Sequence, residues 1–468
     1  MSPWSAAPLF AALASSSLVE VARGQLASAA APAPATARSV ELSLSASPAR
    51  LILKAGVPTP VFSYNGTVPG PTLDLREGDN VTIRFRNELP VATTVHWHGF
   101  HLPFESDGSP FHPVAPGETY EYRFTVPPGT AGTYWYHPHP DHSTGAQVAR
   151  GLYGAIIVRA ADDPLAALPE QVLILSDNRL TPEGEIDFPD PHSMHGRRDR
   201  ENGREGELLL VNGKVLPTLT IRSGEVQRWR VINASAGRSY RLALAGQTLL
   251  HVGSDGGLFE RPVEVSELLV SPSERVEFLV RGSGAPGSST ALQALPYDRY
   301  VPQTRPENWN EVRNLATLEY TSEPPMTPPP LPATLRKVEP IDTTLATATR
   351  VIVLGQGLIN GKVMDMSRVD VSTTVGATEI WQVENVVGMD HPFHLHGFRF
   401  QVLDRNGVPE PFLSWKDMVN VPKHETVRFI VTYDDFPGKW MFHCHILDHE
   451  DHGMMGVLEI RGDPQVAR

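Results

Sequence analysis

The chain has 468 residues and a formal net charge of −13, with 41% hydrophobic and 20% charged residues. This length allows roughly three domains of ordinary size, and the composition is that of a chain that folds around apolar cores. An acidic surface does not attract nucleic acid or an anionic membrane, so both are excluded as partners, and no apolar run of about 18 residues predicts a membrane span.

The first 38 residues have features of an export signal followed by a linker. Residues 6–19 are mildly apolar and precede small-residue sites near Ala27 and Ala30, but no Lys or Arg precedes the apolar run. Residues 28–38 are rich in Ala and Pro, which is typical of a disordered linker. We therefore expect the protein in the periplasm or outside the cell.

The rest of the chain carries one spacing three times. Short runs rich in Val, Thr, Tyr and Phe alternate with Gly and Pro turns, which predicts an all-β sandwich architecture. In each copy an Asn-Gly pair (65–66, 212–213, 360–361) precedes a glycine, an asparagine nine residues later, and a third position nine residues after that. The copies are Gly78, Asn87 and His96; Gly224, Asn233 and Leu242; and Gly376, Asn385 and His394. Three copies indicate three homologous β-domains.

The repeat sets the predicted boundaries. Domain one spans 39–160, domain two 165–320 and domain three 339–468, and a proline-rich linker covers 321–338. Prolines stiffen this linker, and its length allows domain three to fold back onto domain one.

Four His-x-His pairs occur, two in each outer domain, at 96/98, 137/139, 394/396 and 443/445. Both histidines of such a pair face the same side of a strand. Eight imidazoles are too many for one ion, but they suit a small cluster of copper ions in an interdomain cleft. Domain two has Leu242 and Leu244 at the matching offsets, so it is expected to contribute no ligand.

Cys444 is the only cysteine, which excludes a disulfide within the chain, and it stands between His443 and His445. In a strand its side chain points away from those of its two neighbours. Two histidines, one cysteine and a weak axial methionine form a mononuclear blue-copper site. His449, Met454 and His391 complete that set with Cys444, and the chain itself gives electrons a short route from Cys444 to its neighbours.

These motifs, HxH, HxH, HxxHxH and HCHxxxHxxxxM, are similar to those of the multicopper oxidases, and over about residues 39–465 the chain resembles their bacterial three-domain laccase-like members. The resemblance implies three tandem cupredoxin-like Greek-key β-sandwich domains and four copper ions. It assigns the type 1 copper to His391, Cys444 and His449 with Met454 axial, the type 2 copper to His96 and His394, and the type 3 pair to His98, His137, His139, His396, His443 and His445.

The resemblance also implies a reaction in which a type 1 copper takes single electrons from a donor and a trinuclear cluster reduces O₂ to water. Asp107 and Glu450 match acidic positions that deliver protons in similar oxidases, although either could be an ordinary surface carboxylate. Asp390, next to His391, could accept a phenol hydrogen or attract a cation, or could be a turn residue.

Two donor classes fit this chemistry: phenols and aromatic amines, or the metal ions Cu(I), Mn(II) and Fe(II). Only ten methionines occur, with no large cluster, which favours the phenolic donors because Cu(I) seeks thioethers. A non-catalytic copper-binding relative of the same fold is a third interpretation, disfavoured because every ligand position is filled. We expect a monomer whose partners are O₂ and a small reductant, with specificity set by loops around His391, residues 415–418 and residues 296–300.

Overall fold

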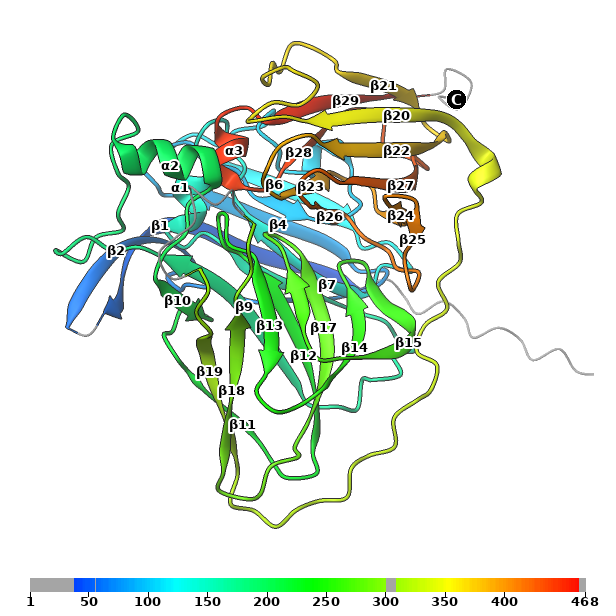
Figure 1. Cartoon of the computed structure of the whole chain (residues 1–468). Helices are drawn as coiled ribbons and strands as arrows, with labels where there is room; N and C mark the ends of the chain where they lie inside the picture. The colour runs from blue at the N-terminus through cyan, green and yellow to red at the C-terminus, as the bar shows by residue number, and fades with distance from the viewer. Residues whose placement is uncertain (1–37, 55, 300–308, 463–468) are drawn as a thin grey trace, which may run out of the picture. The chain divides into compact units, whose positions relative to one another are not determined.

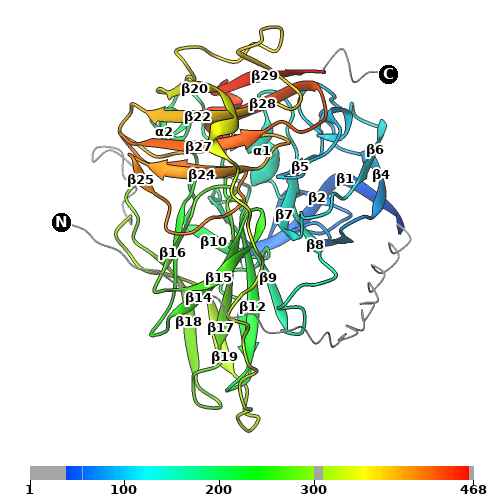
Figure 2. The same ribbon diagram turned by 90° about the vertical axis from the view of Figure 1, so that its right-hand side faces the viewer.

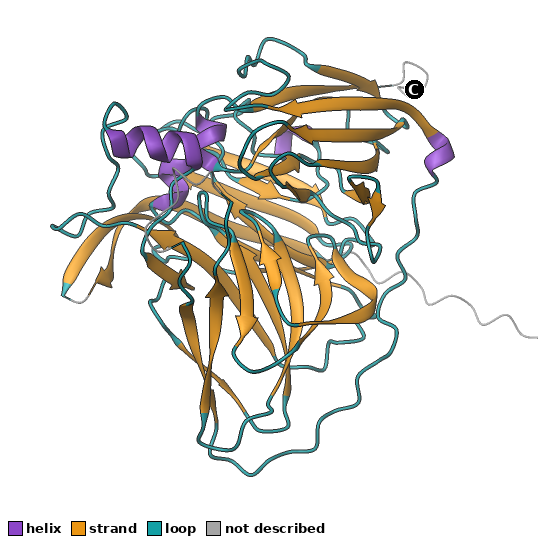
Figure 3. Ribbon diagram, viewed as in Figure 1, coloured by secondary structure: helices purple, strands orange, loops and turns teal. Residues whose placement is uncertain are grey.

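The computed structural model describes residues 38–54, 56–299 and 309–462 (Figure 1). The expected export signal and the end of the 296–300 loop lie outside these residues. Strands make up most of the described chain and only a few short helices interrupt them (Figure 3), which confirms the all-β class. Six sheets form, two from each third of the chain, which confirms the three β-sandwich domains.

The first third forms one sheet in the order β2-β1-β4-β6 and another in the order β3-β8-β7-β5. Its elements are β1 (Ser39–Lys54), β2 (Val57–Tyr64), β3 (Leu73–Arg76), β4 (Asn80–Asn87), β5 (His96–His98), η1 (Phe104–Ser106), β6 (Thr119–Thr125), β7 (Gly132–His137), α1 (Thr144–Ala149) and β8 (Gly154–Arg159). Ile83 and Phe85 of β4 share one buried cluster with Tyr134 and Tyr136 of β7, so the core lies between the two sheets.

The second third forms sheets in the orders β10-β9-β12-β17-β14-β15 and β11-β19-β18-β13-β16. Its elements are β9 (Glu170–Asn178), α2 (Met194–Asn202), β10 (Leu208–Val211), β11 (Thr218–Ile221), β12 (Val226–Asn233), β13 (Tyr240–Leu244), β14 (Leu249–Ser254), β15 (Gly257–Val265), β16 (Leu268–Val270), β17 (Arg275–Arg281), β18 (Ser289–Leu295) and β19 (Arg313–Tyr320). Leu242 and Leu244, which stand where the outer domains have histidines, are buried in its core.

The last third forms sheets in the orders β20-β22-β27-β24-β25 and β21-β29-β28-β23-β26. Its elements are η3 (Thr343–Leu345), β20 (Ala346–Leu354), β21 (Val371–Thr374), β22 (Thr378–Asn385), β23 (His391–Leu395), β24 (Phe400–Arg405), β25 (Val408–Pro409), β26 (Met418–Val421), β27 (Thr426–Thr432), β28 (Gly438–Cys444), α3 (Leu447–Asp451) and β29 (Met455–Arg461). Figure 2 shows these strands from a second side. Trp381, Phe393 and Phe442 join Cys444 in the core.

The repeated residues have the same structural role in each domain. Each Asn-Gly pair has positive φ at both residues, as a type I′ hairpin turn requires. The repeated asparagine donates from its Nδ2 to two main-chain carbonyls; the donor and acceptor sets are Asn87 to Val91 and Val114, Asn233 to Arg238 and Val270, and Asn385 to Met389 and Val421. This contact fixes the loop after the strand, so the next strand begins at a constant offset.

The proline-rich segment between domains two and three forms backbone hydrogen bonds with domain two. Met326 N donates to the Ser223 carbonyl, and Leu335 N and Arg336 N donate to carbonyls of β15. The segment is therefore attached along domain two before it enters domain three. The boundaries at 39–160, 165–320, 321–338 and 339–468 stay predictions. No helix among the described residues is long and apolar enough to cross a membrane.

Candidate metal centre

Strand pairing brings the two histidine pairs of each outer domain together. In domain one, β5 pairs with β7 so that His96 is opposite His137. In domain three, β23 pairs with β28 so that His394 is opposite His443. All eight histidines of the four pairs are at most 1% exposed. The repeat therefore places equivalent pairs in equivalent registers.

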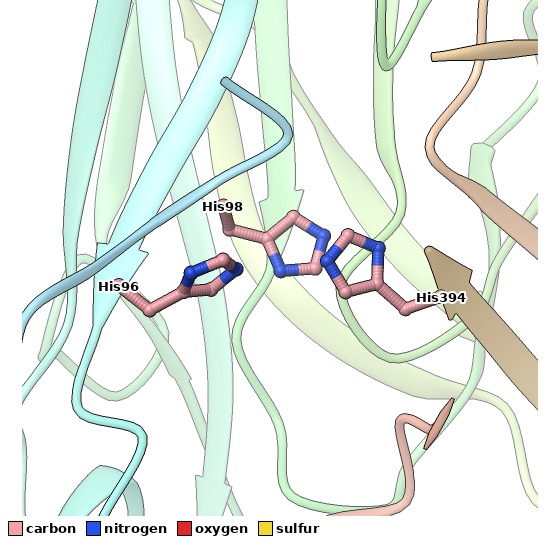
Figure 4. A group of neighbouring side chains, drawn as sticks. All are labelled: His96, His98 and His394. Carbon is pink, nitrogen blue, oxygen red and sulfur yellow. The ribbon is translucent and has the colours of Figure 1, made fainter. Parts of the chain in front are cut away.

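The two domains then meet through these rings. His96 stacks on His396 with 4.0 Å between ring centroids, and His98 stacks on His394 at 3.8 Å. Figure 4 shows His96 and His98 from β5 facing His394 from β23. Residues about 300 positions apart in the chain thus share one buried cluster.

Three of the groups of potential ligand atoms within this cluster consist of histidines alone, with members from both outer domains. Within each group the atoms lie within 4.8 Å of one another. The groups are His96, His98 and His394; His98, His137 and His445; and His139, His396 and His443. All eight histidines predicted to surround a copper cluster are therefore brought together.

The outer nitrogens of these rings face oxygen acceptors. His96 Nδ1 lies 2.8 Å from the Asp107 carbonyl, and His394 Nδ1 lies 2.8 Å from the Asp417 carbonyl. Further pairs of this kind are His98 Nε2 with Asp417 Oδ1 (3.0 Å), His396 Nδ1 with Asp107 Oδ2 (3.0 Å), His137 Nδ1 with the Pro138 carbonyl (2.9 Å) and His443 Nδ1 with the Cys444 carbonyl (3.1 Å). Each such contact places the ring proton on the outer nitrogen and leaves a lone pair on the inner one.

The inner nitrogens fit a bound cation. His396 Nε2 and His443 Nε2 are 3.0 Å apart, and His139 Nε2 is 3.4 Å from His443 Nε2. His96 Nε2 and His394 Nε2 have no hydrogen-bond partner. Two buried lone pairs that face each other repel unless a cation lies between them. Neutral imidazoles are good ligands for copper, so these residues fit the metal that the sequence predicts.

Burial favours the neutral form of six of these rings. It lowers the pKa of His98, His137, His394, His396 and His445 well below the ordinary value, and neighbouring histidines lower these pKa values further. The same causes lower the pKa of His139 to about 4, against the opposing influence of Glu450. A neutral ring has the free lone pair that a metal ligand needs.

Asp107 and Asp417 have reciprocal roles between the two outer domains. Asp107 follows η1 in domain one; its carbonyl faces His96 of its own domain and its carboxylate faces His396 of domain three. Asp417 precedes β26 in domain three; its carbonyl faces His394 and its carboxylate faces His98 of domain one. The sequence predicted Asp107 but missed Asp417, because no common offset relates the two aspartates.

Glu450, the second predicted proton carrier, lies in α3 and is 1% exposed. Its Oε2 is 3.2 Å from His443 Nδ1 and its Oε1 is 3.5 Å from His139 Nδ1. Burial opposes ionisation of Glu450, but His139 and His443 outweigh it and lower the pKa of this carboxyl to about 2. The structure thus places both Asp107 and Glu450 against predicted ligands.

A separate group joins the predicted blue-copper residues. One ligand atom from each of His391, Cys444 and His449 lies within 4.8 Å of the others, and Cys444 Sγ is 3.6 Å from His449 Nδ1. Cys444 is opposite Phe393 across the β23–β28 pairing and lies in the domain core, whereas His443 and His445 face the histidine cluster. Met454 is fully buried in the same core. Burial raises the pKa of the Cys444 thiol to about 12.

A pocket of about 210 Å³ opens beside this group. Its lining includes His391, His449, Met389 and Glu201. The Nε2 of His391 has no hydrogen-bond partner, whereas His449 Nε2 is 3.1 Å from the Glu201 carbonyl at the end of α2. Helix α2 of domain two therefore covers the edge of His449, which the sequence did not indicate.

Asp390 does not line this pocket. It is 3% exposed, and its carboxylate accepts from the Tyr297 hydroxyl, from Asn420 Nδ2 at 3.1 Å and from Lys423 N at 3.0 Å. The side chain faces the elements that support β23, which fits the turn residue that the sequence left open, and its contact with a donor molecule stays a prediction. Asp390 holds these elements in place.

All three thirds of the chain match family models described as multicopper oxidase, over residues 46–163, 175–323 and 327–463. The "Multicopper oxidase mco" of Staphylococcus aureus is 32% identical over 415 residues, which cover 85% of this chain and 83% of that protein. The "Laccase" of Bacillus subtilis is 29% identical over 475 residues, covering 86% of this chain and 90% of that protein.

Among solved structures, the chain is similar to "Multicopper oxidase from Campylobacter jejuni: a metallo-oxidase". The TM-score is 0.82 and the sequence identity is 34%, with 90% of this chain and 92% of that chain covered. The three two-sheet sandwiches are therefore cupredoxin-like domains, as the sequence predicts.

Proposed function

The chain belongs to the multicopper oxidase family and is a copper oxidoreductase that uses O₂, and on that premise we propose a laccase-like reaction for it. Four molecules of a phenol or aromatic amine each lose one electron, and one O₂ takes up the four electrons and four protons to give two waters. The strongest support is the set of buried imidazole nitrogens, from two distant thirds of the chain, whose lone pairs face one another.

We assign the histidine groups to four copper ions. The type 1 copper would be held by His391, Cys444, His449 and Met454; the type 2 copper by His96 and His394; and the type 3 pair by His98, His137 and His445 for one ion and His139, His396 and His443 for the other. Groups of ligand atoms within 4.8 Å of one another support the type 1 set of His391, Cys444 and His449 and both type 3 sets, whereas His96 and His394 form a group together with His98.

Bound copper supplies one-electron redox chemistry at the first site and four-electron transfer to O₂ at the cluster. The chain supplies the connection between them. Cys444 faces the type 1 group while His443 and His445, its neighbours in sequence, face the cluster. Consecutive Cα atoms are about 3.8 Å apart, so an electron leaving the Cys444 sulfur passes along covalent bonds to either ring.

Reduction of O₂ to water also consumes protons, and we assign their delivery to Asp107 and Glu450. Asp107 Oδ2 lies 3.0 Å from His396 Nδ1, and Glu450 Oε2 lies 3.2 Å from His443 Nδ1. Both carboxylates are therefore next to rings of the same type 3 group. Each carboxylate orients an imidazole, and its place beside the cluster positions it to pass protons on for the reduction of O₂.

The donor would enter through the pocket at His391. Its volume of about 210 Å³ accommodates a single aromatic ring, and the ring of His391 lies in its wall. The Nε2 of His449 is covered by α2, whereas the Nε2 of His391 has no hydrogen-bond partner. His391 is therefore the ligand that a donor in this pocket would meet. An aromatic donor stacked there would be in contact with a copper ligand.

A metallo-oxidase reaction is the second candidate. Met389 and Glu201 both line the pocket and offer a thioether and a carboxylate to an incoming metal ion. The similar protein from Campylobacter jejuni is described as "a metallo-oxidase". A non-catalytic copper-binding role is the third candidate, and it is disfavoured because all twelve assigned ligand positions are filled.

We further propose that the chain acts as a monomer in the periplasm or outside the cell, with O₂ and a small reductant as its partners. We also propose the domain boundaries that the sequence predicts, at 39–160, 165–320, 321–338 and 339–468. The sequence features that support export are the apolar run at 6–19 and the small residues after it.

Oxygen uptake by the copper-loaded protein tests the proposal. We expect about four copper ions per chain, uptake with a phenol, and weaker uptake with Cu(I). Cys444→Ser is expected to abolish the blue absorption and turnover with both donors, whereas His452→Gln, at an exposed neighbouring histidine, leaves both unchanged. Blue absorption that survives Cys444→Ser contradicts the site, and uptake with Cu(I) alone favours the metallo-oxidase.

A further inference from the structure

Domain two supplies no histidine to the cluster, yet its residue Arg275 contacts residues that support the cluster. Arg275 begins β17 and is fully buried. Its guanidinium group contacts all three domains: Asp417 of domain three, the Ser273 carbonyl of domain two and the Thr133 carbonyl of domain one. Each contact leads to one histidine of the group formed by His98, His137 and His445.

The first contact leads to His98. Arg275 Nη1 donates to Asp417 Oδ1 at 2.8 Å, and Nη2 donates to Oδ2, so the guanidinium grips the carboxylate with two parallel hydrogen bonds. The same Oδ1 is 3.0 Å from His98 Nε2. The guanidinium therefore fixes the carboxylate that orients the ring of His98.

A glycine makes room for this arrangement. Gly99, directly after His98, has φ +84, and a Cβ placed there would lie 2.8 Å from the Arg275 guanidinium and 2.5 Å from the Asp417 carboxylate. Only a glycine combines that backbone conformation with so close an approach. The chain at His98 is thus shaped around the ion pair.

The second contact leads to His445. Arg275 Nη1 donates to the Ser273 carbonyl at 2.9 Å. Ser273 has φ +70, an uncommon conformation for a residue with a side chain, and its Oγ is 2.8 Å from the ring nitrogens of His445. Arg275 therefore holds in place the strained residue that touches the second ring.

The third contact leads to His137. Arg275 Nε donates to the Thr133 carbonyl at 3.0 Å. Thr133 lies on β7, the strand that ends at His137. One side chain of domain two is therefore connected to the supports of all three rings in this group.

The other type 3 group is supported differently. The outer nitrogens of His139, His396 and His443 face Glu450, Asp107 and the Cys444 carbonyl, which belong to domains one and three. Resting on the proposed function, we propose that Arg275 is a positioning residue through which domain two assembles one of the two type 3 copper positions, that of His98, His137 and His445.

Arg275→Met tests this proposal, with Arg230→Met as the matched control. Arg230 is also buried and also joins domain two to Thr133, through the threonine hydroxyl at 3.0 Å and Glu277 at 2.7 Å. Its remaining partner is Glu170, so it contacts neither Asp417 nor Ser273, the residues that touch His98 and His445. Copper per chain, blue absorption and the absorption of the coupled type 3 pair are measured together on the full chain. Loss of an orienting partner typically weakens metal affinity about 10–100-fold.

We expect Arg275→Met to lose at least one copper per chain and the type 3 absorption while it keeps the blue absorption, and Arg230→Met to keep all three. Arg275→Lys retains the charge but not the two-pronged geometry, so we expect intermediate occupancy. A full copper complement in Arg275→Met, or the same copper loss in Arg230→Met, overturns the proposal.

Arg275→Met leaves the Asp417 carboxylate buried without its partner, which could prevent folding. The double variant Arg275→Met/Asp417→Asn removes both charges, while the amide oxygen of the substituted side chain can still accept from His98. We expect it to fold and still to bind the copper weakly; full occupancy would show that Arg275 only neutralises charge and would refute its positioning role. If the unmodified chain itself forms no copper cluster, the proposed function fails instead.

Discussion

Acid should weaken domain two through one carboxylate. Glu277 of β17 is fully buried, where Arg228 Nε donates to it at 2.9 Å, Arg230 Nη1 at 2.7 Å and Thr133 Oγ1 at 2.6 Å. Burial opposes its ionisation, but the two arginines and the threonine outweigh burial and lower the pKa of Glu277 from 4.5 to about 2. The unfolded chain therefore binds a proton at Glu277 at a higher pH than the folded chain.

The sign and size of the effect follow from this difference. One pH unit between the two pKa values corresponds to about 1.4 kcal/mol, so Glu277 contributes about 3 kcal/mol to the free energy of unfolding. That contribution is fully present above pH 4.5 and is lost as the pH falls through about 2. By the same relation, about 1.4 kcal/mol remains at pH 3.

Urea unfolding of the copper-free protein and of Glu277→Gln, at a series of pH values, measures this contribution. The difference in free energy of unfolding should be about 3 kcal/mol at pH 6 and should shrink to about 1.4 kcal/mol at pH 3. The buried histidines titrate in both proteins and cancel in the difference. Glu319→Gln, at an exposed position of β19, should show no such trend. A difference that stays constant between pH 6 and pH 3 would refute the assignment of the pKa shift.

Three further substitutions test the site and the core. Gly108 has φ +76, and Gly108→Ala places a Cβ against the Val95 carbonyl. The substitution should lower the free energy of unfolding by about 2 kcal/mol and lower copper occupancy, both measured on the purified variant. Full copper occupancy would show that the loop adapts. Asp107→Asn should slow O₂ reduction without slowing anaerobic reduction of the blue site, and unchanged turnover at every pH removes Asp107 from proton delivery. Phe429→Ala removes a fully buried ring that stacks on Phe400 with 4.0 Å between centroids. Urea unfolding should show that the free energy of unfolding falls by about 3–5 kcal/mol. A decrease below about 1 kcal/mol would mean that neighbouring side chains fill the cavity.

The repeat made much of the fold predictable. An asparagine that fixes the loop after a strand and an Asn-Gly turn are local devices, so their positions can be read from spacing alone. The alternation of side chains along a strand likewise predicted that Cys444 would face away from His443 and His445, and the structure has this arrangement.

Local patterns left the environment of Asp390 open. Its position next to His391 allowed either a contact with the donor or a place in a turn, and only the structure shows that the partners of its carboxylate are Tyr297, Asn420 and Lys423, which come from other elements. The cover that α2 places over His449 could not be predicted either, because it depends on a domain-two helix meeting α3 about 250 residues later.

The sequence by itself determined which side chains can bind copper, because ligand chemistry belongs to residue type and the strand period sets which faces they share. Only the tertiary structure decided what surrounds them. Asp417 contacts His98 from 319 positions away in the chain, and Arg275 contacts Asp417 from 142 positions away, both across domain boundaries. Such contacts follow from how three folded domains pack together, and no local spacing in the chain encodes them.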